Sequence, residues 1–124
     1  MVERIVLGNL ELDHDRFEAR IDGELVDLTY IQFELLYHLA SHANRVVDRQ
    51  QLLEAIWGSA SEDAARKLRI HVSRLRKRIA ESRPWLIKTV TKRGYALVNT
   101  EAGILPAFVL AHAPVRPTGL SEGA

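Results

Sequence analysis

Residues 64–79, AARKLRIHVSRLRKRI, contain the pattern that decides the fold. Four apolar side chains recur here at steps of four, three and four, which places them on one face of a helix: Leu68, Val72, Leu75 and Ile79. No acidic residue occurs from Arg66 to Arg78, so basic side chains occupy the other sides. The stretch therefore predicts a helix with one buried stripe and a cationic outer surface.

The face opposite the apolar stripe is the candidate binding surface. It holds Arg66, Ile70, Ser73, Arg74 and Lys77. One flank of the helix adds Lys67, His71 and Arg78, and the other adds Arg69 and Arg76. A surface helix usually interleaves both signs of charge, so this one suits a polyanion. The alternative is a run of charge that is merely solvated.

The charges of the chain are strongly segregated. The formal net charge of the 124 residues is only +1. However, residues 66–93 contain eleven Lys or Arg and a single acid, Glu81, whereas the rest of the chain has six basic and fifteen acidic residues. One segment is thus near +10 and the remainder near −9. Such asymmetry directs one side of a protein toward phosphates.

The composition indicates one water-soluble domain. The hydrophobic fraction is 47% and the charged fraction 27%, with no cysteine. No apolar run reaches the ~20 residues of a membrane-spanning helix, and the N-terminus lacks a signal-peptide pattern, so we expect a cytoplasmic protein. His38 and His42 are four residues apart, but no third ligand lies near them. Because no catalytic triad or glycine-rich phosphate loop occurs either, we expect no enzyme, metal or cofactor.

The residues before the basic helix predict a small sheet and two helices. Short alternating segments in residues 4–28 indicate an antiparallel sheet, and Asp22-Gly23 is typical of a hairpin turn. Thr29 and Gln32 form a capping box that starts the first helix. Asp48 would start the second helix, which Gly58 would end. Ser61 or Asp63 would then cap the basic helix, predicted at about 64–80.

A hairpin follows the basic helix. Pro84 ends the helical segment, and two β-prone runs, 85–90 and 95–98, flank a turn at Thr91-Lys92-Arg93-Gly94. The sequence thus places a basic helix directly before a hairpin with a basic tip. The helix would suit one groove of a duplex and the hairpin the neighbouring groove. Residues 101–124 hold three of the four prolines and show no clean period. We therefore expect one domain over 1–100 and a Pro/Gly/Ala-rich tail over 101–124.

Four motifs in this order resemble the DNA-binding domain of OmpR/PhoB-type response regulators. Each motif is quoted as it stands here: Leu28-Thr29 with Gln32-Phe33-Glu34-Leu35-Leu36; Val46-Val47-Asp48-Arg49-Gln50-Gln51-Leu52-Leu53 with Trp57-Gly58; Ile70-His71-Val72-Ser73-Arg74-Leu75-Arg76-Lys77; and Thr89-Val90 with Gly94-Tyr95. The match covers about residues 10–98. The resemblance implies an α+β winged helix-turn-helix with a small N-terminal antiparallel sheet, three helices and a C-terminal β-hairpin wing.

The resemblance also implies a function. The chain would bind double-stranded DNA sequence-specifically as a transcriptional regulator, with the basic helix in the major groove and the wing, 89–98, on the adjacent backbone or minor groove. The expected DNA-contacting residues are Arg66, Lys67, Ile70, His71, Ser73, Arg74, Arg76, Lys77, Arg78, Lys92 and Arg93. By analogy, loop 58–65 is a candidate contact for RNA polymerase. We also expect that the chain can bind DNA as a homodimer, and we expect no membrane partner.

Three features depart from the family pattern. Arg69 stands where an acid is usual, Thr91 where the wing often has Arg, and Lys92 where it has Gly. Lys92 and Arg93 would therefore supply the basic contacts of the wing. The family's receiver domain has no counterpart in this sequence, so the controller of binding would lie elsewhere. The alternative function is a winged helix that binds another protein and no DNA.

Overall fold

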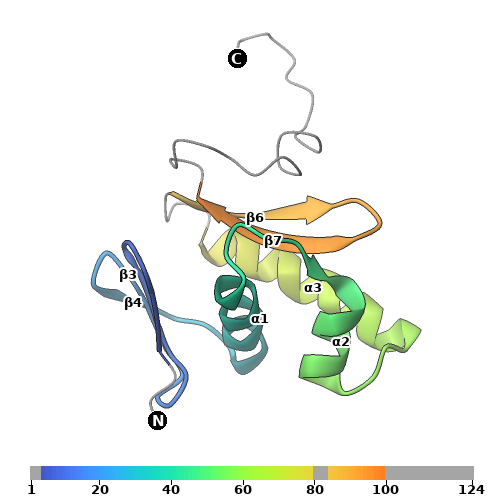
Figure 1. Ribbon diagram of the computed structural model, residues 1–124. Coiled ribbons are helices and arrows are strands. Elements are labelled where there is room, and N and C mark those ends of the chain that lie inside the picture. Colours follow the sequence, from blue (N-terminus) through green and yellow to red (C-terminus); the bar gives the residue numbers. More distant parts are fainter. Residues whose placement is uncertain (1–3, 80–83, 100–124) are drawn as a thin grey trace, which may run out of the picture.

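The computed structural model describes residues 4–79 and 84–99 (Figure 1). Its elements are β1 (Arg4–Leu7), β2 (Leu10–Asp13), β3 (Glu18–Ile21), β4 (Glu24–Val26), α1 (Tyr30–Ser41), β5 (Val47–Asp48), α2 (Arg49–Trp57), α3 (Glu62–Arg78), β6 (Trp85–Val90) and β7 (Gly94–Asn99). The predicted tail, 101–124, lies outside the described residues.

The N-terminal strands form an antiparallel sheet in the order β1-β2-β3-β4. Alternate residues of β2 and β3 point to opposite faces. Leu10, Leu12, Ala19 and Ile21 are buried beneath it, whereas the charged residues between them face outward. Asp22 has a φ of 55°, which suits the predicted turn. The predicted sheet is thus confirmed, with one face on the core.

The first helix begins as the sequence predicts. The Thr29 hydroxyl accepts the Gln32 N–H at 3.2 Å, and the Gln32 side chain accepts the Thr29 N–H at 3.0 Å. These reciprocal bonds satisfy two amides that the helix itself leaves unpaired. Phe33, Leu36 and other apolar residues of α1 are buried between the sheet and the remaining helices. The first helix is therefore the centre of the domain (Figure 1).

The helix-turn-helix has caps at each end of its turn. Asp48 accepts the Gln50 N–H at 2.8 Å and starts α2, and Gly58 ends it at a φ of 67°, which favours glycine. The Ser61 hydroxyl accepts the Ala64 N–H at 3.2 Å. Because Ser61 rather than Asp63 is the cap, α3 begins at Glu62, two residues earlier than we predicted. The connecting loop is consequently 58–61 and not 58–65.

A second antiparallel sheet, in the order β5-β7-β6, carries the predicted wing. The hairpin of β6 and β7 lies where the sequence placed it. The sequence analysis predicted no strand before the second helix, but Val47 and Asp48 form β5 and pair with β7. A Cβ on Gly94 would lie 2.0 Å from the Val47 carbonyl oxygen, so only glycine fits this crossing. The α+β winged helix-turn-helix architecture is confirmed.

Long-range contacts join the two sheets to one core. The buried apolar residues of both sheets and all three helices form a single cluster. The Trp85 indole N–H donates to the Asn9 side-chain oxygen at 2.9 Å, which ties the base of the wing to the β1–β2 turn. The orientation of the wing is therefore set by the whole domain. Within the described residues, no helix is both long and apolar enough to span a membrane.

Candidate nucleic-acid interface

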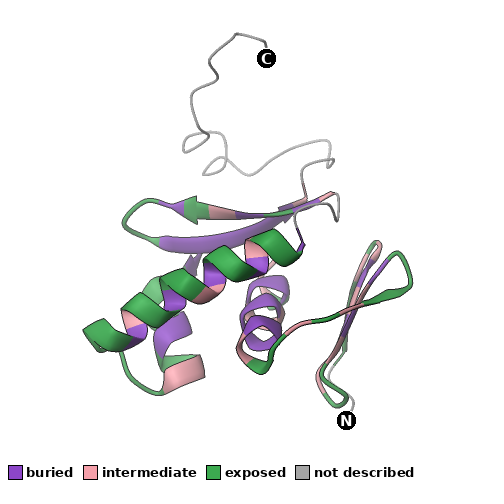
Figure 2. Ribbon diagram, turned by 180° about the vertical axis from the view of Figure 1, so that it is seen from behind, coloured by how far each residue is buried: buried purple, intermediate pink, exposed green. Residues whose placement is uncertain are grey.

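The third helix has the two faces that its sequence predicts. Leu68, Val72, Leu75 and Ile79 are each at most 3% exposed. They pack toward α1, α2 and the wing, and the outer side of the helix is exposed along its whole length (Figure 2). The buried stripe therefore fixes which side chains of α3 face solvent.

Most of the predicted contact residues gather on that outer side. Arg66, Lys67, Ile70, Ser73, Arg74, Lys77 and Arg78 are all exposed. A shallow hollow of about 340 Å³ brings several of them together, lined by Arg66, Arg69, Ile70, Ser73, Arg74 and Lys77. Ile70 is 37% exposed, so an apolar side chain stands among cations. This combination suits base edges, where cations meet guanine and apolar groups meet the thymine methyl.

An acidic residue restrains the N-terminal end of this surface. Asp63 pairs with Arg66, three residues along the helix, and with Lys67, four residues along, the latter at 3.2 Å. The hydrogen bonds from Lys67 and then Arg66 hold the pKa of the Asp63 carboxyl below its usual value. Since all three groups are exposed, these pairs are weak. Arg66 and Lys67 thus exchange Asp63 for another anion at small cost.

The rest of the helix has no such restraint. Arg69, Arg74, Lys77 and Arg78 pair with no carboxylate among residues 4–79 and 84–99. Their charges are directed to solvent on an exposed helical surface. Because no carboxylate of the described residues pairs with them, their combined field attracts a polyanion.

His71 lies at the edge of the surface and is only partly exposed. Its ring is 6.0 Å from that of Trp57 on α2. The buried Nδ1 has no hydrogen-bond partner within the part of the chain that the structure describes. Desolvation by burial, followed by the charges of Arg74 and Lys67, lowers the pKa of His71. The imidazole is therefore biased to its neutral form, in which one ring nitrogen still donates a hydrogen bond.

Arg76 differs from the other predicted residues, because its guanidinium is already engaged by the wing. Its Nε–H donates to the Ile87 carbonyl oxygen at 3.0 Å, and a terminal N–H₂ donates to the Thr89 hydroxyl. The side chain is partly buried as a result. The DNA contact expected of Arg76 stays a prediction, and in the structure its side chain links α3 to β6.

The wing presents the two remaining predicted residues on the turn between β6 and β7. Lys92 and Arg93 are exposed there, and neither lines the hollow on α3. The Arg93 carbonyl accepts the Arg49 N–H at 3.0 Å, which fixes the turn against the start of α2. Helix and wing therefore form two separate contact regions on one rigid frame.

The sequence analysis missed Arg49. It lies at the first position of α2 and lines a hollow of about 800 Å³, together with Arg66 and Arg69 of α3 and the acidic Glu62 and Asp63. The signal was present in the sequence, since Arg49 directly follows the helix cap Asp48 and precedes the basic helix. Helix starts favour anions through free amides and the helix dipole. Arg49 thus adds a cation of α2 beside the N-terminal end of α3, in a hollow that carries both signs of charge.

A family model described as "Transcriptional regulatory protein, C terminal" matches residues 23–97. Among curated proteins, the transcriptional regulatory protein CpxR of Klebsiella pneumoniae subsp. pneumoniae is 38% identical over 93 residues. The regulator RpaA of Synechocystis sp. is 36% identical over 99 residues. These matches cover 73% and 77% of this chain but only 40% and 41% of the relatives. The chain therefore spans about two fifths of their length.

Solved structures agree with these matches. The RstA DNA-binding domain of Klebsiella pneumoniae, solved in complex with the RstA box, is 33% identical with a TM-score of 0.68, covering 77% of this chain and 97% of that one. The DNA-binding domain of CpxR from E. coli is also 33% identical with a TM-score of 0.68, covering 79% and 98%. The chain belongs to the family of transcriptional regulatory protein C-terminal domains, as a winged-helix output domain of the OmpR/PhoB type.

Proposed function

We propose that this chain binds double-stranded DNA sequence-specifically as a transcriptional regulator. The observation that carries the proposal is the outer surface of α3, where exposed cations surround an exposed isoleucine and, beyond Lys67, pair with no carboxylate among the described residues. This surface belongs to a helix that follows a capped turn, the geometry with which helix-turn-helix domains enter the major groove. Relatives of the same fold have been solved on DNA, which supports the proposal.

The residues divide by what they would contact. Arg74 and Ile70 face outward midway along α3, and we assign them to base edges. Arg66, Lys67, Lys77 and Arg78 lie along the helix, where phosphates are within reach, and Ser73 and His71 add hydrogen-bonding groups. Lys92 and Arg93 would contact the neighbouring backbone or minor groove. We also assign Arg49 to the phosphate contacts. Arg76 would instead act by its bonds to β6 of the wing.

The proposed DNA-binding function also suggests protein partners. Loop 58–61 and the first two residues of α3, Glu62 and Asp63, are exposed, which leaves them open to RNA polymerase when α3 lies on DNA. Binding as a homodimer would pair two half-sites. A receiver or other controller would act from outside residues 1–100, and residues 101–124 would form a tail. The proposal assigns no catalytic activity or cofactor to the chain, and it places the protein with its DNA in the cytoplasm.

Selection of bound sequences from a random duplex pool tests the proposal. The chain should enrich one motif, and the spacing of any repeated half-site would report dimer geometry. A scrambled duplex of equal length is the matched control, because it retains every phosphate but lacks the motif. Enrichment of no sequence, together with binding to a protein that salt does not weaken, would instead favour a protein-binding winged helix.

A further inference from the structure

The strongest unassigned feature is the link that Arg76 makes between α3 and the wing. The two hydrogen bonds to Ile87 and Thr89 both reach β6. The guanidinium carbon also lies 6.0 Å from the centroid of the Tyr95 ring on β7, within reach of a cation–π contact. A single side chain of α3 therefore contacts both strands of the wing.

The position of β6 in its sheet gives this link its importance. The order β5-β7-β6 makes β6 an edge strand, paired with β7 on one side. Edge strands leave backbone groups without a strand partner. The bond to the Ile87 carbonyl satisfies one of these groups from α3. Thr89 lies just before the turn that carries Lys92 and Arg93, so the link acts close to the wing tip.

The other contact of the wing tip is made by backbone. The Arg49 N–H donates to the Arg93 carbonyl, and Gly94 crosses tightly over Val47. These contacts hold β7 against β5 and α2. Neither of them reaches β6, whereas Arg76 holds β6 to the helix that carries Arg74. Arg76 is thus a side-chain bridge between the two proposed DNA-contacting elements.

We propose that Arg76 is a positioning residue for DNA binding, which fixes the wing against α3 so that Arg74 and Arg93 meet one duplex together. This inference rests on the proposed function. When two contact groups are held in one geometry, the second contact is made without a further loss of freedom. Loosening β6 would therefore weaken binding although no contact to DNA has been removed. The guanidinium of Arg76 itself would stay bonded to β6 and would not pair with a phosphate.

The variant Arg76→Gln tests this, with Arg78→Gln as matched control. Both lose one positive charge from α3, but Arg78 is exposed and has no bond to the wing among the described residues. Arg76→Gln should weaken binding to the selected site by about tenfold, because misplaced contacts are costly. Its dependence on salt should match that of the wild type. Arg78→Gln should reduce the salt slope by about one unit, as expected for a lost phosphate contact.

A second variant separates positioning from charge. Thr89→Val removes the hydroxyl that Arg76 binds while leaving every cation in place. It should also weaken binding to the selected site, but by a smaller factor than Arg76→Gln does, because the bond to Ile87 remains. In an Arg76→Gln background, Arg93→Ala should then weaken binding by a smaller factor than it does alone, since the loosened wing keeps its contact with DNA but the cost of ordering it offsets part of the gain. A reduced salt slope for Arg76→Gln, or full additivity with Arg93→Ala, would identify Arg76 as a phosphate contact and overturn the proposal.

Amide hydrogen exchange on the full chain without DNA distinguishes this inference from the proposed function. Arg76→Gln should speed exchange in β6 and leave β2 and β3 unchanged, because the link touches only the wing. Unchanged exchange in β6 would overturn the link even if DNA binding holds. Faster exchange in β6, in a protein whose wild type binds no duplex, would confirm the link but refute both the positioning role and the proposed function.

Discussion

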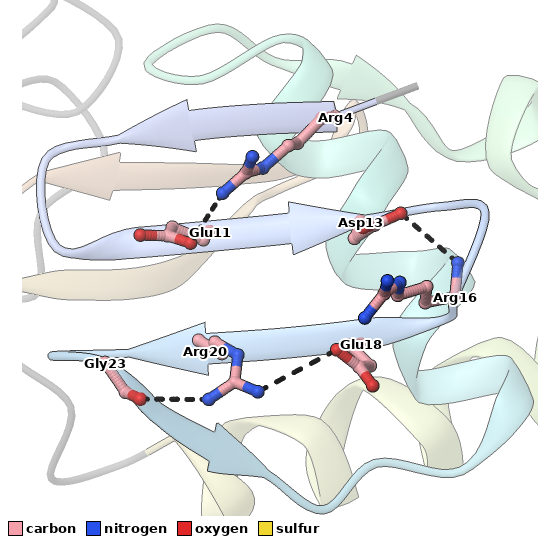
Figure 3. A network of polar contacts seen from close by, with 7 residues as sticks. All are labelled: Arg4, Glu11, Asp13, Arg16, Glu18, Arg20 and Gly23. Carbon is pink, nitrogen blue, oxygen red and sulfur yellow. Dashed lines mark hydrogen bonds and ion pairs between the residues drawn. The ribbon is translucent and has the colours of Figure 1, made fainter. Parts of the chain in front are cut away.

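Two charged surfaces of this domain differ in how their charges are paired. The outer face of the N-terminal sheet carries both signs, and its groups bind one another (Figure 3). Arg4 pairs with Glu11 at 3.0 Å, and Arg20 lies 3.9 Å from Glu18 and donates to the Gly23 carbonyl at 3.1 Å. These residues line a hollow of about 420 Å³. The outer surface of α3 is mostly cationic, and beyond Lys67 its cations pair with no carboxylate among the described residues.

The difference shows that the number of charges does not identify a nucleic-acid surface. Exposed pairs such as Arg4–Glu11 contribute little to stability, and they cancel one another's field. The cations of α3 repel each other and gain most when a polyanion arrives. The net charge of +1 conceals this contrast entirely. The pairing of each charge with its neighbours therefore indicates where DNA would bind.

The largest expected effect comes from removing the support of the cationic surface. Leu75 is fully buried beneath it, and Leu→Ala at such a site costs about 2–5 kcal/mol of unfolding free energy. Lys77→Ala, two residues along on the exposed side, should change stability by less than about 0.5 kcal/mol. Urea denaturation of both variants measures this. Equal losses would mean that the buried and exposed faces of α3 are misassigned.

A smaller effect separates the two surfaces by function. Arg74→Ala should cost about 1–3 kcal/mol of binding free energy on the selected duplex and relax the preference at one base pair. Arg20→Ala removes the same charge from the outer face of the N-terminal sheet, where Arg20 lies beside Glu18, and should leave the affinity unchanged. Titration of each variant on selected and scrambled duplexes gives both values. A comparable loss from Arg20→Ala would show that the paired charges of the sheet also contact DNA.

Arg93→Ala should act more uniformly than Arg74→Ala. Arg93 lies on the exposed turn of the wing, where backbone contact is expected. The variant should weaken selected and scrambled duplexes by similar factors and reduce the salt slope by about one unit. Titrations at two salt concentrations distinguish these outcomes. If Arg93→Ala instead changed the base preference, the wing would read sequence and α3 would only position it.

The smallest effect concerns pH. Burial, Arg74 and Lys67 lower the pKa of His71, so the unfolded chain binds a proton more readily than the folded one. The stability associated with neutral His71 is therefore present above its ordinary pKa of about 6.5 and is lost as the pH falls through the lower, folded value. His71→Gln should lose less stability than the wild type between pH 8 and pH 5, as followed by thermal melting. Parallel losses in both proteins would contradict the assigned shift.

The sequence predicted what repeats along the chain or closes within a few residues. The stripe of Leu68, Val72 and Leu75 is visible as a period, and the Thr29–Gln32 box as a spacing of three. Charge segregation also pointed to the outer surface of α3. Such features arise from local geometry, so neighbouring residues suffice to find them.

What the sequence could not show depends on contacts between distant residues. Arg76 was indistinguishable from its basic neighbours until β6 was placed beside α3, eleven and thirteen residues away. The bond from Trp85 to Asn9 spans 76 residues, and β5 is too short for a strand pattern. Arg49 joined the surface only when α2 and α3 were packed together. For Arg76, Trp85 and β5, chain order alone contains no signal of these contacts, whereas the position of Arg49 directly after the helix cap Asp48 was a signal that the sequence did contain.

The dependence of DNA affinity on salt tests the central claim most directly. Each phosphate that a cation neutralises releases a counterion, so log K should fall against log salt with a slope of about −0.9 for each contact. The cations of α3 and the wing tip, which beyond Lys67 pair with no carboxylate in the part of the chain that the structure describes, predict a slope of several units for the wild-type chain. Arg20→Ala should leave that slope unchanged. Binding that stays constant from low to physiological salt would contradict an electrostatic DNA surface.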